Sequence, residues 1–389
     1  MKIFLLTLSI FFFCHSADSQ IFTQAKAEKA LQNYRDNLAL LRKEHSNGRN
    51  LPNVEFFLFG MGDRLKMIYK NGMLINAKTQ KVLRRWKIKS SIIVPSEYLV
   101  HLELENGKAL DIQEDSQGVY IYENNIQIIM AESGLNLPNF DGKKFAPVLR
   151  VLHHEILMNI DEGLPLANFM VYSKPTYRNA AMPIMAISKT NNLNLIINWV
   201  TNLKEPYNRS REGNPEIDNF GQVLYIISTV SDRNHPLIEK VLEEADLYKN
   251  GEYIEGKTND TYHPVYQTKW MKYGLKSLGI ADSYKIPLVY DNHSPVFWVD
   301  YKTQNVGGRQ FDEPTSLNSP YLTWAEDHTF NQKRGIVSLK DYPLSWESEA
   351  LEANYSKMAI VDNAYANTKI CATHAWHAAE MFLLLLEQK

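Results

Sequence analysis

The spacing of apolar residues changes near residue 145, and this change limits the folds open to the chain. Between residues 54 and 130, short apolar or alternating runs are separated by turn residues, including Asn71-Gly72 and Asn106-Gly107. Asn-Gly between two such runs is typical of a β-hairpin, so we expect an antiparallel β domain of about seven to nine strands. From residue 146 to residue 389 the apolar residues follow helical spacing instead. An α+β chain with separate β and helical domains is therefore predicted.

The first 52 residues carry two further signals. Lys2 is followed by an apolar run that ends at Cys14 and then by small polar residues up to Gln20, which is the order of parts in a secretory signal peptide. The apolar run is shorter than the about 17–25 residues that a membrane-spanning helix needs. We therefore expect residues 1–19 to be removed after Ser19 and the protein to be secreted or periplasmic. Residues 20–52 are predicted to be a helical lead and a linker, and no membrane span is expected anywhere.

Six polar-aromatic clusters divide the helical region at similar intervals. Each cluster precedes a segment of small and apolar residues that we expect to be a buried helix. The clusters are Tyr177-Arg178-Asn179, Asp218-Asn219-Phe220, Tyr262 to Tyr266, Asp291-Asn292-His293, Trp324 to His328, and His374 to His377. Their spacing averages about 40 residues, the length of a helical hairpin repeat. If such hairpins close into a ring, the starts of the inner helices meet at one end and the clusters line a single funnel.

The motifs TYRNAAM, DNFGQVLY, HPVYQTKWMKYGL, YLTWAEDH and THAWHAAEMFL look like those of six-hairpin, (α/α)6-toroid glycosidase-like proteins of the uncharacterised bacterial type. The resemblance covers residues 54–389 in architecture. It implies a β-sandwich over residues 53–145, followed by an α/α-toroid catalytic domain over residues 146–389. One departure concerns Asn179, because an acid is expected after the Arg of the first cluster.

Carboxylates are the side chains that cleave glycosidic bonds, one as an acid and one as a base or nucleophile. The clusters and the segments after them offer Asp218, Asp291, Glu326, Asp327 and Glu347. Glu326 and Asp327 are adjacent and stand beside Trp324, where the pKa of one carboxyl can be raised toward that of a general acid. In a ring of six helical hairpins, the cluster that contains Asp218 would lie opposite the cluster that contains Glu326 and Asp327. A separation of the carboxyl groups wide enough to admit a water molecule predicts inversion of the anomeric configuration. We therefore predict Glu326, Asp327 and Asp218 as catalytic residues, with helix capping as the alternative for each acid, above all for Glu347.

The other polar and aromatic residues of the clusters are predicted to bind the sugar. Tyr and Trp rings can stack on sugar faces, while Arg, Asn and His can form hydrogen bonds with hydroxyl groups. Taken singly, each of these residues is more often part of the core, but their recurrence at helix starts favours binding. The predicted set is Tyr177, Arg178, Asn179, Asn219, Tyr262, His263, Asp291, Trp324, His328, Glu347, His374, Trp376 and His377.

Charge and motif context disfavour several other functions. The chain has 42 Lys and Arg against 44 Asp and Glu, so no basic stripe is expected to bind nucleic acid. The segment Gly251–Thr258 fits the P-loop expression but lacks the strand before it and the helix after it. His374, His377 and Glu380 cannot all lie on one face of a helix, so they are not expected to bind a metal ion together. We predict a carbohydrate substrate, no cofactor, no metal and no obligate protein partner.

Two further functions stay open beside hydrolysis. A polysaccharide lyase would use Tyr262 or His263 to abstract a proton while Arg178 and Asn179 neutralise a uronate carboxylate. A non-catalytic carbohydrate-binding protein would keep the aromatic funnel and cleave nothing. Products with an unsaturated, ultraviolet-absorbing end would indicate a lyase, and binding without cleavage would indicate a binding protein.

Overall fold

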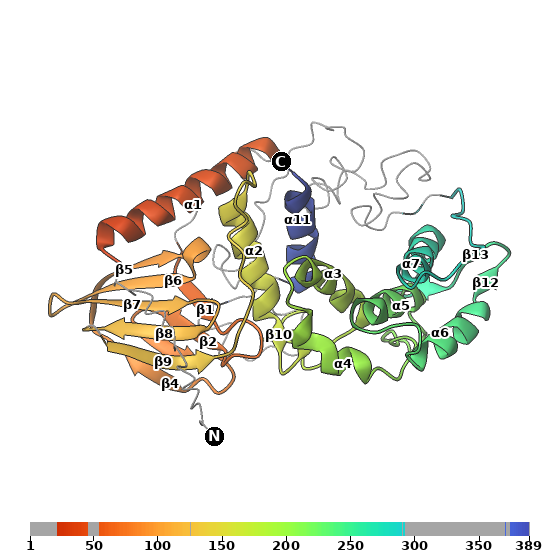
Figure 1. Cartoon of the computed structure of the whole chain (residues 1–389), viewed down its shortest axis with the longest axis horizontal. Coiled ribbons are helices and arrows are strands. Elements are labelled where there is room, and N and C mark those ends of the chain that lie inside the picture. Colours follow the sequence, from red (N-terminus) through yellow and green to blue (C-terminus); the bar gives the residue numbers. More distant parts are fainter. Residues whose placement is uncertain are drawn as a thin grey trace, which may run out of the picture.

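The computed structural model describes residues 22–45, 54–124, 126–289, 291, 370 and 374–388. In these residues one helix and two antiparallel sheets come first along the chain, and helices follow (Figure 1). The predicted order of an antiparallel β region and a helical region is confirmed.

The described residues of the β region form nine strands in two antiparallel sheets, and within each sheet every strand pairs with the next one along the chain. The first sheet contains β1 (Phe56–Phe59), β2 (Met67–Lys70), β3 (Met73–Asn76) and β4 (Val82–Arg85). The second contains β5 (Ile88–Val94), β6 (Leu99–Leu104), β7 (Ala109–Glu114), β8 (Gly118–Glu123) and β9 (Ile126–Glu132). Asn71 and Gly72 turn the chain between β2 and β3 with φ of 48° and 71°, as a type I′ turn requires. Both Asn-Gly hairpins are confirmed.

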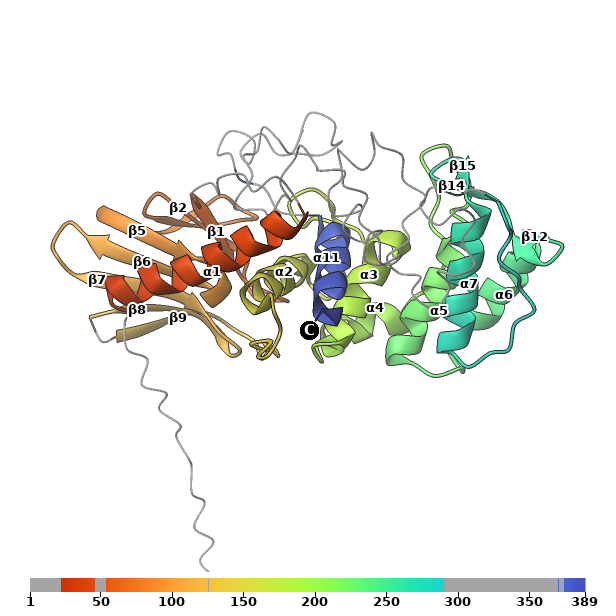
Figure 2. The same ribbon diagram turned by 90° about the horizontal axis from the view of Figure 1, so that it is seen from above.

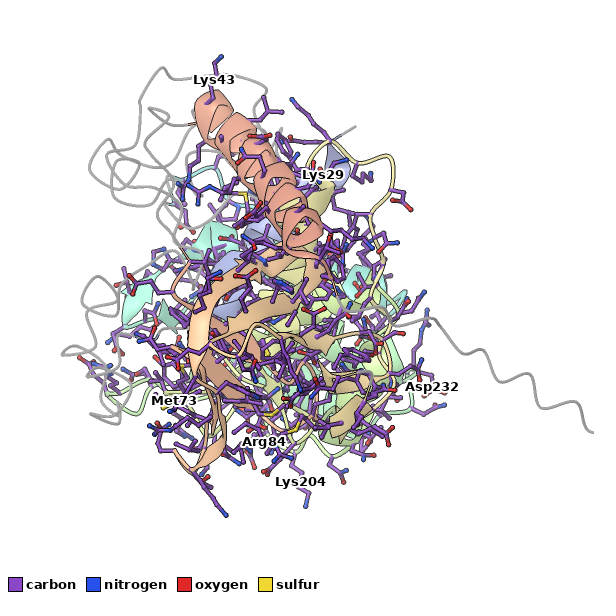
Figure 3. The ribbon with its side chains drawn as sticks, turned by 90° about the vertical axis from the view of Figure 1, so that its left-hand side faces the viewer. Lys29, Lys43, Met73, Arg84, Lys204 and Asp232 are labelled. Carbon is purple, nitrogen blue, oxygen red and sulfur yellow. The ribbon has the colours of Figure 1, made fainter. Side chains whose placement is uncertain are left out.

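Helix α1 (Gln24–His45) confirms the predicted helical lead. It contacts β5, the short 3-10 helix η1 (Pro95–Glu97) and α2 (Ala146–Met158). Its buried residues Ala27, Tyr34, Leu38 and Leu41 recur at helical spacing along one face. Lys43 points away from the opposite side of the helix (Figure 3). Helix α1 therefore packs against an edge strand of the five-stranded sheet.

The helical region contains longer helices joined by loops and two-residue strand pairs. The helices after α2 are α3 (Tyr177–Ser188), α4 (Ile197–Thr201), α5 (Asn219–Val230), α6 (Leu237–Asp246), α7 (Pro264–Ser277) and α11 (Ala375–Glu387). The strand pairs are β10 (Ile160–Asp161) with β11 (Leu164–Pro165), β12 (Lys249–Asn250) with β13 (Tyr253–Ile254), and β14 (Lys257–Thr258) with β15 (Thr261–Tyr262). Helices α3, α5, α7 and α11 begin at or next to four of the predicted clusters. The described helices do not form a closed ring.

Two glycines bring α5 and α7 into direct backbone contact. A Cβ at Gly221 would come closer than 3.0 Å to backbone atoms of Trp270 and Met271, and a Cβ at Gly274 would overlap the carbonyl oxygen of Gly221. Gln222 lies opposite Tyr266 and Leu224 lies opposite Gly274, so the two helices run in the same direction. Their starts therefore lie at the same end.

Helix α11 packs on α2 and α3 although it is far from both in the sequence. The backbone N–H of Ala375 donates to the carbonyl of Ala167 at 2.8 Å, and Lys143 Nζ donates to the carbonyl of Leu386 at 2.7 Å. Figure 2 shows α7 and α11 both starting on its upper side, where β14 and β15 lie. The first turns of several helices therefore face the same side of the molecule.

Helix α2 buries two adjacent histidines completely. His153 Nε2 lies 2.9 Å from Thr190 Oγ1, and His154 Nε2 lies 2.9 Å from the carbonyl oxygen of Leu58. Burial lowers the pKa of each imidazole to about 3. Both side chains are therefore neutral in the folded protein over the physiological pH range.

We expect the free energy of unfolding to fall as the pH drops below about 6.5. In the unfolded chain His153 and His154 take up protons near that pH, whereas in the folded chain burial holds their pKa at about 3. Since the unfolded state binds more protons between these values, each histidine lowers stability by about 2 kcal/mol at about pH 5. Urea unfolding at neutral and acidic pH measures the effect. In the variant His153→Gln, the free energy of unfolding should fall less on acidification, by the contribution of one histidine. An unchanged pH dependence would show that burial of His153 does not cause the loss of stability.

Candidate functional site

An ion-pair cluster lies where the starts of α3 and α5 meet the β14–β15 hairpin. Arg178, the second residue of α3, donates from Nε to Asp218 Oδ2 at 2.7 Å and from Nη2 to Asp218 Oδ1 at 2.9 Å. Nη2 also donates to Glu216 Oε2, and Nη1 donates to Asn259 Oδ1 at 2.6 Å. One guanidinium group thus joins two helix starts and a hairpin. These four residues are called the Arg178 cluster below.

Asp218 is fully buried at the start of α5. Besides Arg178, it accepts hydrogen bonds from Thr258 Oγ1 at 3.1 Å, Gln222 Nε2 at 2.8 Å and Asn219 Nδ2 at 3.3 Å. Burial by itself lowers the pKa of Arg178, but the charge and hydrogen bonds of Asp218, together with electrostatic interactions with Tyr266 and Glu216, raise that pKa above its ordinary value. These contacts favour a role in holding Arg178 over the predicted direct role of Asp218 in catalysis.

The β14–β15 hairpin fixes one side of the Arg178 cluster. Its two turn residues, Asn259 and Asp260, have φ of 49° and 60°, a conformation that a type I′ turn requires and that Asn and Asp tolerate better than other side chains. The backbone N–H of Asn259 donates to Glu216 Oε2 at 2.9 Å. Asp260 Oδ1 accepts hydrogen bonds from Ser210 Oγ at 2.8 Å and Asn214 Nδ2 at 3.1 Å. The turn is therefore anchored on both sides.

A histidine and a carboxylate meet at the start of α7. His263 Nδ1 lies 2.9 Å from Asp291 Oδ1, and Asp291 Oδ2 accepts a hydrogen bond from the backbone N–H of Tyr266 at 3.0 Å. Asp291 thus caps the helix and orients the imidazole. Tyr262, the residue before His263, has 59% of its surface exposed. An oriented imidazole can take up or release a proton if substrate reaches its other nitrogen.

Tyr266 lies next to the Arg178 cluster, in the first turn of α7. Its hydroxyl oxygen lies 3.4 Å from Gln222 Nε2, and its side chain is buried. Burial raises the pKa of Tyr266, and the negative charges of Asp218 and of Glu380 on α11 raise it further. The phenol is therefore protonated and is a hydrogen-bond donor at physiological pH.

Other predicted binding residues make contacts inside the protein. Tyr177 donates its hydroxyl to the carbonyl of Glu205 at 2.6 Å, and its ring centroid lies 6.3 Å from that of Trp199. Asn219 accepts a hydrogen bond from the backbone N–H of Asn208 at 2.9 Å and is buried. Asn179 is half-buried in the first turn of α3. The contacts of Tyr177 and Asn219 favour packing roles over the predicted sugar contacts.

The start of α11 brings together the aromatic residues predicted there. The rings of His374 and His377 lie 5.2 Å apart, and the ring of Trp376 lies 5.5 Å from that of His377. Burial lowers the pKa of His374 to about 4 and that of His377 to about 3. Both imidazoles are therefore neutral near pH 7 and able to donate or accept hydrogen bonds with a hydroxyl group.

Several predicted residues lie outside the described part of the chain: Trp324, Glu326, Asp327, His328 and Glu347. Conversely, the sequence interpretation did not select Glu216, Gln222, Thr258, Asn259 or Tyr266 for the site. Gln222 follows Asp218 by one helical turn, and Tyr266 belongs to the third cluster, so both had a local signal. Glu216, Thr258 and Asn259 come together only through the tertiary fold.

The described residues contain no group of three or more His, Cys, Asp or Glu side chains that could hold a metal ion. No helix among them has the length and apolar character to cross a membrane. No protein-family model matches the chain, and neither a curated protein nor a solved structure matches it.

Proposed function

We propose that the protein is an exported glycoside hydrolase that cleaves an uncharged oligo- or polysaccharide by carboxylate acid/base catalysis with inversion. The observation that carries the proposal is the Arg178 cluster, in which one cation is matched by two acids, Asp218 and Glu216. The cluster therefore has one more negative than positive charge. Surplus negative charge disfavours anionic sugars and leaves neutral ones as the better fit.

The proposal extends to the architecture and to the catalytic pair. The two sheets of the β region would form the predicted β-sandwich, and the described helices α2 to α7 and α11 would belong to the (α/α)6 toroid of the glycosidase-like proteins that the motifs resemble. The common direction of α5 and α7 supports this arrangement. Asp218 would face Glu326 or Asp327 across the funnel, and the two carboxyl groups would act as the catalytic acid and base.

The test is a digest of neutral polysaccharides with the exported chain. We expect new reducing ends, and we expect proton NMR to show that the first product has the anomeric configuration opposite to that of the substrate. The variant Glu326→Gln should lose turnover while keeping the melting temperature of the wild-type protein. A panel of neutral glycans left uncleaved would remove the hydrolase proposal, and a product with retained configuration would remove inversion.

A polysaccharide lyase is the second candidate because Asp291 orients His263 at 2.9 Å beside the exposed Tyr262. A lyase also needs a cation to neutralise the uronate carboxylate, and the charge of Arg178 is already matched by two acids. Ultraviolet-absorbing products from a uronate-containing polysaccharide would select the lyase. Binding without either kind of product would select a non-catalytic carbohydrate-binding protein.

A further inference from the structure

Arg178 keeps one hydrogen-bond donor that no described residue uses. Its guanidinium carries five N–H groups. Four of them donate within the Arg178 cluster, two to Asp218 and one each to Glu216 and Asn259. The remaining N–H is on Nη1, next to the one that donates to Asn259, and 18% of the side chain is exposed. A ligand beside Nη1 would therefore meet a charged donor.

Glu216, which accepts from the same guanidinium group, also keeps an acceptor that no described residue uses. Its Oε2 takes both hydrogen bonds from the cluster, one from Arg178 Nη2 and one from the backbone N–H of Asn259 at 2.9 Å. Within the described chain no group donates to Oε1, although only 10% of the Glu216 side chain is exposed. Oε1 is not among the described side-chain atoms that are both buried and without a partner, so it reaches solvent and a ligand or water can donate to it.

We infer that Arg178 and Glu216 form a subsite for two neighbouring hydroxyl groups of an uncharged sugar, an assignment that rests on the proposed carbohydrate function. One hydroxyl donates to Glu216 Oε1 while its neighbour accepts from Arg178 Nη1. The exposed ring of Tyr262, on β15 of the same hairpin, offers an apolar surface for the sugar. The carboxylate of a uronic acid would instead meet the negative charges of Glu216 and Asp218.

The surrounding contacts hold this subsite in one geometry before the sugar arrives. Buried Asp218 fixes the Nε–Nη2 edge of the guanidinium, and the anchored turn at Asn259 and Asp260 fixes Glu216 and Nη1. A site that is already ordered loses less conformational entropy on binding. The sugar would therefore replace water without rearranging the helix starts.

The experiment measures binding, not turnover, on a printed array of neutral and uronate-containing oligosaccharides. The key variant is Glu216→Gln. Because Arg178 and Asn259 both donate to one oxygen, the amide oxygen of glutamine takes that place and its NH2 group turns toward the sugar, where an acceptor is needed. The control is Glu212→Gln, the same change in the same loop, at a side chain that is 64% exposed. Melting temperatures verify that both variants are folded.

We expect the wild type and Glu212→Gln to bind neutral glycans equally well. The affinity of Glu216→Gln for the same glycans should be lower by a factor of at least about ten. Equal binding by Glu216→Gln, or wild-type binding of uronates alone or of no glycan, overturns the subsite. If Glu216→Gln does not fold, the wild type is compared on the same neutral glycans before and after periodate, which cleaves vicinal diols. Retained binding after periodate also overturns the subsite.

The outcomes separate this inference from the hydrolase proposal. Diol-dependent binding by a wild-type chain that releases no reducing ends removes the hydrolase and leaves the subsite. Cleavage by Glu216→Gln with an unchanged KM removes the subsite and leaves the hydrolase.

Discussion

Replacing Asp218 by alanine is expected to lower the free energy of unfolding by about 3–5 kcal/mol. The carboxylate is fully buried and accepts two hydrogen bonds from Arg178 and others from Thr258, Gln222 and Asn219. Its removal leaves a largely buried guanidinium with Glu216 as its only acidic partner and leaves the neutral donors without their acceptor. Urea unfolding near neutral pH measures the loss.

Asp36→Ala is the matched control for this change. Asp36 lies on the exposed side of α1 and accepts one hydrogen bond, from Gln32 at 2.7 Å. Its loss should change stability by less than about 0.5 kcal/mol. A loss below about 1 kcal/mol for Asp218→Ala would show that the Arg178 cluster is not structural. Independently, normal turnover by a folded Asp218→Asn variant would remove Asp218 from the catalytic mechanism.

Local signals in the sequence were enough to predict much of the fold. The Asn71-Gly72 turn requires positive φ at both residues, and few sequences other than Asn-Gly meet this requirement. The starts of α3, α5, α7 and α11 were also recognisable because polar and aromatic residues precede small apolar ones there. Apolar residues in the segment around Trp199 also recur at helical spacing, but α-helix covers only Ile197–Thr201 after a 3-10 turn from Leu193. Its asparagines and β-branched residues have weak helix propensity.

The site was less predictable because its contacts join segments far apart in the sequence. Arg178 and Asp218 were both selected as cluster residues, but nothing in the sequence shows that they form an ion pair with each other. Asn259 lies in a turn whose residues have no periodicity and whose partner, Glu216, is on another loop. Tyr177 illustrates a second limit, since a tyrosine at a helix start has the same local pattern whether it packs on Trp199 or faces a ligand.

Replacing Gly221 by alanine is expected to destabilise the protein by about 3 kcal/mol, although alanine normally stabilises a helix by about 1 kcal/mol relative to glycine. The reason is the contact between α5 and α7, where a new Cβ would overlap backbone atoms of Trp270. Backbone atoms cannot rotate away as a side chain does, so the two helices must separate. Because Asp218 and Gln222 lie in the first turn of α5 and Tyr266 lies in that of α7, separation would also disturb the Arg178 cluster.

The sign of the stability change is the informative result for Gly221→Ala. Gly134→Ala serves as the control, since no heavy atom lies within 4 Å of the place its Cβ would occupy, and it should leave stability unchanged or slightly raised. Urea unfolding compares the two variants, and glycan binding compares their sites. Stabilisation by Gly221→Ala would mean that α5 and α7 separate without cost, and the contact could then not be what aligns Asp218 and Tyr266. Destabilisation together with lost glycan binding would tie the helix contact to the geometry of the Arg178 cluster.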